Sequence, residues 1–178
     1  MSRLYLSGLL FLSFFTSFCA QTKFDFSLQD NSRKDFSYKN LSSSNFTKSN
    51  FSKSNFEYST LKKANFTEAD LSYSNLSHTD LRNSTMKNAI LYNADFSYSN
   101  LENLDLSRLD LSNVNFNGAN LKKADFSNSN LTGATFYGAD LSSAAFVNST
   151  VDLKQLYDAK TLDKAILPFG TKYIKKGK

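Results

Sequence analysis

The apolar residues of this chain recur at every fifth position over most of its length. From Phe36 to Val151 the series has no gap, which gives 24 consecutive five-residue repeats around an apolar centre residue. A helix advances about 100° per residue, so a period of five would spread the centres around its whole circumference. A flat strand alternates faces, so an odd period would send successive centres to opposite sides. The pattern therefore predicts a chain that turns a corner in each repeat and coils around one axis.

The centre residues also show how many repeats complete a coil. Every fourth centre falls into a column of one residue type, whereas taking every third centre mixes Phe with Leu. One column is entirely leucine: Leu41, Leu61, Leu81, Leu101, Leu121 and Leu141. A second column is phenylalanine except at Leu76: Phe36, Phe56, Phe96, Phe116 and Phe136. Four repeats, or twenty residues, therefore make one coil, and the 24 repeats make about six coils.

The residues around each centre carry a family resemblance. Ser or Ala usually stands two places before the centre and Asn or Asp one place before it, as in the recurring SNF, ADL and ANL. This pattern resembles the pentapeptide repeat family, with its consensus A-(D/N)-L-x-x, over about 116 residues. The resemblance implies an all-β fold, a right-handed quadrilateral parallel β-helix. The segment VDLKQLYDAKTLDKAILPFG resembles the terminus of that family, which implies a short C-terminal capping helix followed by a turn, with Lys164 where glycine is common.

The chain divides into five segments on this pattern. Asn31 breaks the apolar series, so residues 21–35 are expected to form an irregular first coil. Residues 36–151 are the repeat β-helix, 152–170 the cap, and 171–178 a basic tail. Three successive repeats carry a large residue where Ser or Ala is usual, at Leu104, Leu109 and Val114, which predicts a local swelling of the coil.

The first 20 residues are typical of a signal peptide. Arg3 precedes an apolar run over residues 4–18, which is short for a membrane span. Ala20 fits ordinary cleavage, whereas Cys19 resembles the acylated cysteine of a bacterial lipoprotein, and both alternatives stay open. We expect an exported protein of the periplasm or cell surface, anchored to the membrane only if Cys19 is lipidated. Cys19 is the only cysteine, so an intrachain disulfide is excluded.

Charge and motifs favour no enzymatic chemistry. The net charge is +5, but residues 36–151 hold ten basic and ten acidic residues, so the signal for nucleic-acid binding is weak. His78 is the only histidine, and no second His or Cys completes a metal set with it. Neither a Ser-His-Asp arrangement nor a glycine-rich phosphate loop stands out. We therefore expect no enzyme, no cofactor and no metal.

One outward column of rings is a candidate binding surface. Tyr38, Tyr58, His78 and Tyr98 stand twenty residues apart, two places after their centres, and Tyr137 lies further along the same face. Such a stripe favours binding of a glycan or of a protein, or else stacks on itself to support the coil.

Three functions compete on the sequence alone. The leading interpretation is a non-catalytic structural or protein-interaction solenoid of the bacterial cell envelope, with an unidentified protein partner and a homodimer through a solenoid end as a further option. The first alternative is glycan or ligand binding through the Tyr/His column. The second borrows from relatives that mimic DNA and bind gyrase. It is disfavoured because that activity requires an acidic rod in the cytoplasm, whereas residues 36–151 are neutral and the chain begins with an expected export signal.

Overall fold

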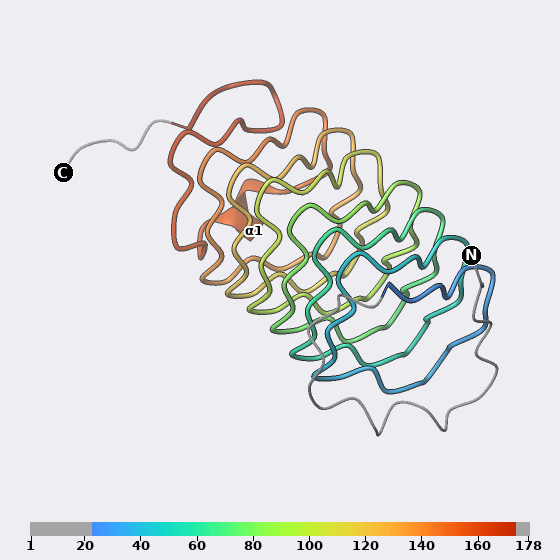
Figure 1. The fold of residues 1–178 in the computed structure, drawn as a ribbon. Helices are drawn as coiled ribbons and strands as arrows, with labels where there is room; N and C mark the ends of the chain where they lie inside the picture. The colour runs from blue at the N-terminus through green and yellow to red at the C-terminus, as the bar shows by residue number, and fades with distance from the viewer. Residues whose placement is uncertain (1–22, 174–178) are drawn as a thin grey trace.

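The computed structural model describes residues 23–173, which wind into a stack of four-sided coils (Figure 1). Parallel β-bridges join the residue before one centre to the residue twenty places later, as in Asp35↔Asn55 and Asn100↔Asn120. This spacing confirms the twenty-residue coil. Within residues 23–173 the walls consist of isolated bridges rather than extended strands, and the one helix is α1 (Leu153–Leu156). Longer strands do not form because each four-residue turn is followed by a single bridging residue before the next turn begins.

Each corner is a four-residue turn that begins at the centre. The centre carbonyl accepts a hydrogen bond from the amide three residues later, as in Ser44 N to Leu41 O at 3.2 Å. The third residue of each turn is here called the tip. At 23 tips that are not glycine, φ is 55–62°. This left-handed conformation costs roughly 1–2 kcal/mol per residue. Lys164 is one of these tips, with a φ of 59°, so its turn forms without the glycine that is common there.

The interior consists of the centres and the small residues two places before them. Nearly all of the centres are fully buried, and stacked pairs such as Phe46 and Phe66 have ring centroids 4.5 Å apart. Apart from Ser59 and Ser84, whose hydroxyls have no hydrogen-bond partner within residues 23–173, most buried serines at this position donate to the preceding centre carbonyl, as Ser54 Oγ does to Phe51 O at 2.6 Å. These bonds satisfy hydroxyl groups that would otherwise be costly to bury.

The bridging residue before each centre holds the corner. Asn55 Oδ1 accepts from the amide of Glu57 at 3.1 Å, and Asn55 Nδ2 donates to Asp35 Oδ1 in the previous coil at 3.2 Å. The Asn/Asp columns therefore link successive coils as well as capping their own turns.

The structure of the first coil differs from the irregular coil predicted over residues 21–35. Residues 25–35 are regular rather than irregular, since Phe26 N and Asn31 N donate to the second coil at 2.8 and 2.7 Å. Asn31 occupies a centre position, is 5% exposed, and its Oδ1 accepts from Lys34 Nζ at 3.0 Å. The backbone hydrogen bonds to the next coil hold the register even where the centre residue is not apolar. The predicted signal peptide, Cys19, and all but the first three residues of the 171–178 tail lie outside the described residues.

The predicted swelling is present at Leu104 and Leu109. Both side chains are buried, and the backbone hydrogen bonds between residues 83–91 and 102–110 are interrupted. Six amides lack the inter-coil hydrogen bond made at equivalent positions elsewhere: Asn83, Met86, Asn88, Leu91, Asp105 and Asp110. The bridges that would join Thr85 to Asp105 and Ile90 to Asp110 are also missing. Next to Val114 the hydrogen bonds between coils resume, and Asn115 N donates to Ala94 O at 3.1 Å.

The helix α1 lies in the last coil, over the corner formed by residues 131–134. Asp152 is its N-cap, and Gln155 closes a capping box with it. Gln155 Nε2 donates to the carbonyls of Leu131 and Ala134 at 2.9 and 2.7 Å. The helix lengthens this coil by one residue, and the bridge from Asp140 to residue 161 then continues the ladder.

Candidate functional site

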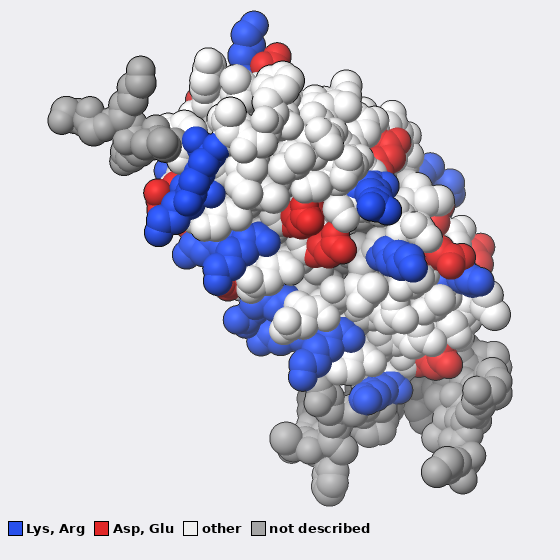
Figure 2. Space-filling view, turned by 90° about the horizontal axis from the view of Figure 1, so that it is seen from above, with Lys and Arg blue, Asp and Glu red and all other residues white. Residues whose placement is uncertain are grey.

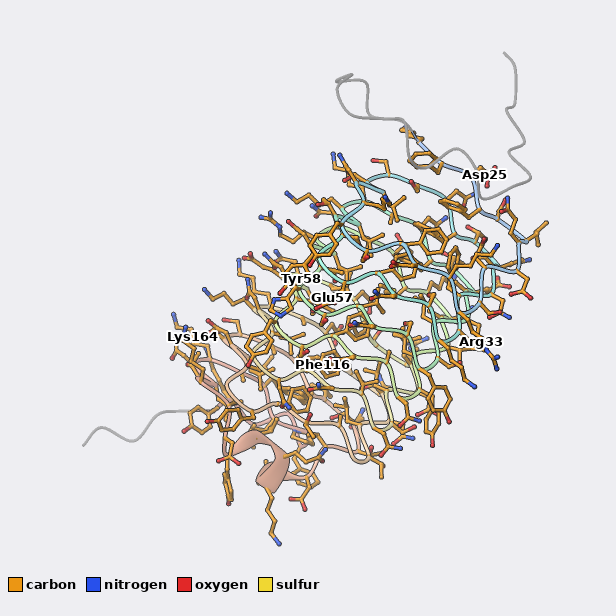
Figure 3. The ribbon with its side chains drawn as sticks, turned by 90° about the horizontal axis from the view of Figure 1, so that it is seen from below. Asp25, Arg33, Glu57, Tyr58, Phe116 and Lys164 are labelled. Atoms are coloured by element: carbon orange, nitrogen blue, oxygen red, sulfur yellow. The ribbon has the colours of Figure 1, made fainter. Side chains whose placement is uncertain are left out.

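The four predicted rings form a continuous stacked column, here called the ladder: Tyr38, Tyr58, His78 and Tyr98. Ring centroids are 5.0 Å apart for Tyr38–Tyr58, 4.5 Å for Tyr58–His78 and 5.0 Å for His78–Tyr98. Interplanar angles are 9–15°. In Figure 3, Tyr58 lies in a column of rings on the side of the rod.

The coil fixes each ring of the ladder at a turn tip. The amides of Tyr38, His78 and Tyr98 each donate to the next coil at 2.9 Å, and that of Tyr58 at 3.2 Å. The left-handed tip conformation points these side chains outward, and the coil rise sets the ring spacing. Binding through the ladder would therefore lose little conformational entropy.

The ladder ends at Gly118, and Tyr137 lies outside it. A Cβ at Gly118 would lie 2.5 Å from Cδ1 of Tyr98, so the Tyr98 ring covers the glycine backbone. In the next coil Gly138 is the tip, and Tyr137 stands one position earlier in that turn. Tyr137 is 71% exposed, and its amide donates to Asn117 Oδ1 at 2.8 Å. Tyr137 therefore shares the side of the rod but not the ring stack.

Stacking decides which parts of the ladder a ligand can reach. Each inner ring presents its two faces to its neighbours, and its side chain remains exposed to solvent elsewhere. The exposed fraction is 73% for Tyr38, 45% for Tyr58 and 64% for Tyr98. Apolar faces of sugars would need the ring faces that are already covered, whereas a protein surface can contact ring edges and hydroxyl groups.

A second exposed cluster, here called the apolar patch, was missed by the sequence reasoning. It consists of Tyr73, Ile90 and Tyr92, which are 52%, 54% and 37% exposed. Tyr73 and Tyr92 meet edge to face at 5.5 Å, and Lys53 Nζ lies 5.6 Å from the Tyr73 ring centroid. The sequence feature that could have revealed this patch is Ile90, which occupies a bridging position where Asn, Asp or Thr is usual.

The basic residues of another side are largely paired. Asp80 Oδ2 lies 3.1 Å from Lys62 Nζ and 2.8 Å from Arg82 Nη2. Burial alone would raise the pKa of Asp80, but hydrogen bonds from Arg82 and Lys62 outweigh it and hold the pKa below its ordinary value. Figure 2 shows a row of basic side chains along one edge of the rod, with acidic side chains on the surface beside it. This mixture fits a solvated face better than a nucleic-acid surface.

Residues 23–173 hold no group of three or more His, Cys, Asp or Glu side chains placed to bind a metal. His78 contacts Tyr58 and Tyr98 through its ring faces. No helix in the described part of the chain has the length and apolar character to cross a membrane.

Two family models match the chain. The model described as "Pentapeptide repeat region" matches residues 80–156, and "Pentapeptide repeats (8 copies)" matches residues 35–62 and 49–88. A search of curated proteins found no match.

Solved structures similar to this chain include three pentapeptide proteins. A pentapeptide repeat protein from the thylakoid lumen of Arabidopsis thaliana is 28% identical, with 81% of this chain and 83% of that chain covered and a TM-score of 0.44. QnrB1, a plasmid-mediated fluoroquinolone resistance protein, is 20% identical, with coverage of 75% and 86% and a TM-score of 0.43. HetL of Nostoc sp. strain PCC 7120 is 22% identical, with coverage of 86% and 90% and a TM-score of 0.26. Because these TM-scores lie below 0.5, the family relationship is based on the sequence models.

Proposed function

Because the chain belongs to the pentapeptide repeat family, we propose that it is a non-catalytic solenoid that binds another protein in the bacterial cell envelope. The ladder is the observation that carries this proposal. It presents three exposed tyrosines in fixed positions along one corner of the rod. Tyrosine is enriched at protein interfaces because it combines a large contact area with a polar end.

The place of action is inferred from the N-terminal sequence. An export signal over residues 1–20 directs the rod to the periplasm or cell surface, with lipid anchoring only if Cys19 is acylated. We also infer the right-handed winding that the family resemblance implies.

The two alternatives have weaker physical support. Glycan binding requires open ring faces, and the inner faces of the ladder are covered by stacking. A DNA-mimicking gyrase partner requires a rod with a large negative charge, and residues 36–151 hold ten basic and ten acidic residues.

Site-specific photo-crosslinking in the producing cells tests the proposal. A photoreactive amino acid at Tyr58 should give a discrete crosslinked protein product, recovered in the envelope fraction. The control is the same label at Lys123, an exposed tip on another side with a φ of 57°. Equal products from both positions, none from either, or a cytoplasmic product would refute the proposal.

The glycan alternative has its own measurement. If sugars bind the ladder, Tyr58→Ser together with Tyr98→Ser should abolish binding to a glycan array without unfolding the protein. We expect no glycan signal even from the unmodified chain.

A further inference from the structure

The last coil leaves one wall of the rod uncovered. In the regular coils a centre amide and the carbonyl two places before it both bond to the next coil, as Leu61 N does to Asp80 O at 2.9 Å. Within residues 23–173 the Val151 amide and the Ser149 carbonyl make no such bond. The chain folds back at residues 167–171, so no further coil runs over this wall. This wall is therefore part of the open end of the stack.

A hollow of about 400 Å³ lies at this wall, lined by residues 148–153, Pro168 and Phe169. Phe169 is 89% exposed, which is more than any other large apolar side chain within residues 23–173, and Leu153 is 43% exposed. Two large apolar side chains therefore border one hollow and stand in solvent. Apolar side chains that gather at one exposed place mark a contact surface more than single ones do.

The turn at residues 167–171 holds Phe169 in this position. Gly170 N donates to Leu167 O at 2.9 Å, and Gly170 has a φ of +74°, a conformation that favours glycine. The residues that follow pair back on the stack, since Tyr173 N donates to Ala165 O at 2.7 Å. The exposed ring is therefore presented by an ordered turn.

Unpaired lysines lie at the same end of the rod. Three exposed lysines make no ion pair in the described part of the chain: Lys154, Lys160 and Lys172. Figure 3 shows Lys164 near the C-terminal end as well. Residues 152–178 hold seven Lys and three Asp, a net charge of +4, whereas residues 36–151 are neutral. The net positive charge of the chain is therefore concentrated in its C-terminal part.

We propose that the C-terminal end of the rod binds the surface of an anionic phospholipid bilayer. Phe169 and Leu153 insert below the headgroups, and the lysines lie against the lipid phosphates. A bilayer matches both features at once, because its surface offers phosphate groups directly above an apolar interior. This inference concerns another surface than the ladder and does not depend on the function proposed above.

Binding at this end leaves the ladder free. Tyr98, the last ring of the ladder, lies about three coils before the last coil, or roughly 14 Å along the rod. The long axis of the rod then points away from the membrane, and the ladder faces sideways into the surrounding solution.

Co-sedimentation with vesicles tests the proposal. The exported protein carries Cys19→Ser, so that no acyl chain is attached, and it is mixed with vesicles of phosphatidylcholine alone or of equal parts phosphatidylcholine and phosphatidylglycerol. We expect binding to the mixed vesicles and much weaker binding to phosphatidylcholine. Phe169→Ser should weaken binding to the mixed vesicles roughly 10-fold or more. Leu28→Ser is the matched control and should leave binding unchanged, because Leu28 is a tip that is 78% exposed at the other end of the rod.

A second pair of variants tests the charge. Lys154→Gln combined with Lys172→Gln should weaken binding roughly 10-fold or more at low salt, and less at high salt. Lys53→Gln combined with Lys63→Gln makes the same change in net charge at two tips far from this end. This control pair should have a much smaller effect.

Two results would overturn the proposal. One is an absence of binding to the mixed vesicles, which would leave a protein as the occupant of this end. The other is an equal effect of a variant and its matched control, for the apolar residues or for the lysine pairs, because the C-terminal end would then have no special part in binding.

Discussion

Replacing Leu104 and Leu109 by alanine should restore the missing backbone hydrogen bonds between residues 83–91 and 102–110. Both side chains lie two places before a centre, where alanine is a usual occupant: Ala64, Ala69, Ala119, Ala124 and Ala139 are all buried at this position. With the two leucines shortened, residues 83–91 and 102–110 can approach to the normal inter-coil distance. The variant should then resemble the regular coils.

The magnitude follows from two opposing terms. Each Leu→Ala change removes three buried carbons at about 0.8 kcal/mol each, so the pair loses roughly 5 kcal/mol of apolar burial. Closure restores six backbone hydrogen bonds at about 1 kcal/mol each, or roughly 6 kcal/mol. The double variant should therefore be nearly as stable as the unmodified chain. Truncating Leu121 and Leu141, centres in a closed part of the rod, should cost roughly 4–10 kcal/mol.

Hydrogen exchange and urea unfolding together measure this outcome. In the unmodified chain the amides of Met86, Asn88 and Leu91 should exchange faster than that of Phe66, one coil earlier, which donates to Thr85 O at 2.8 Å. In the double variant these three amides should become protected. Amides that stay unprotected, together with a loss of stability as large as for the Leu121 and Leu141 pair, would refute the explanation of the parting by side-chain size.

Three further changes have defined outcomes. Phe96→Ala removes a ring that is 0% exposed and should cost about 3–5 kcal/mol in urea unfolding, through the cavity that it leaves. Gly118→Ala should destabilise by at least about 1–2 kcal/mol, because its φ is +69° and the new Cβ would lie 2.5 Å from Tyr98 Cδ1. Adding Tyr98→Ala should recover the steric part of that loss but not the backbone part. The pKa of Asp80 is lower in the folded state than its ordinary 3.8, so the unfolded state takes up its proton first as the pH falls. The stabilisation from Asp80 should therefore be present above about pH 4 and lost below it, and thermal unfolding against pH should show a smaller acid-induced loss in Asp80→Asn.

Much of the fold follows from side-chain size and spacing, and these features were predicted from the sequence. The twenty-residue coil, the ring ladder and the swelling near Leu104 are all of this kind. The first coil was predicted wrongly, because its register depends on backbone hydrogen bonds, which a polar centre such as Asn31 does not disturb. The apolar patch was missed for another reason. Tyr73 and Tyr92 occupy different turn positions in successive coils, so their contact depends on side-chain direction rather than on a shared column.

The twenty-residue coil also determines how the surface responds to insertions and deletions. Adding twenty residues lengthens the rod by one rung and leaves every later side chain on its original side. Adding five residues keeps the apolar interior intact but rotates everything that follows by a quarter turn, so that the remaining ladder rings would move to the neighbouring side. Chain length can therefore reorganise what this protein displays to its surroundings without any substitution in the core.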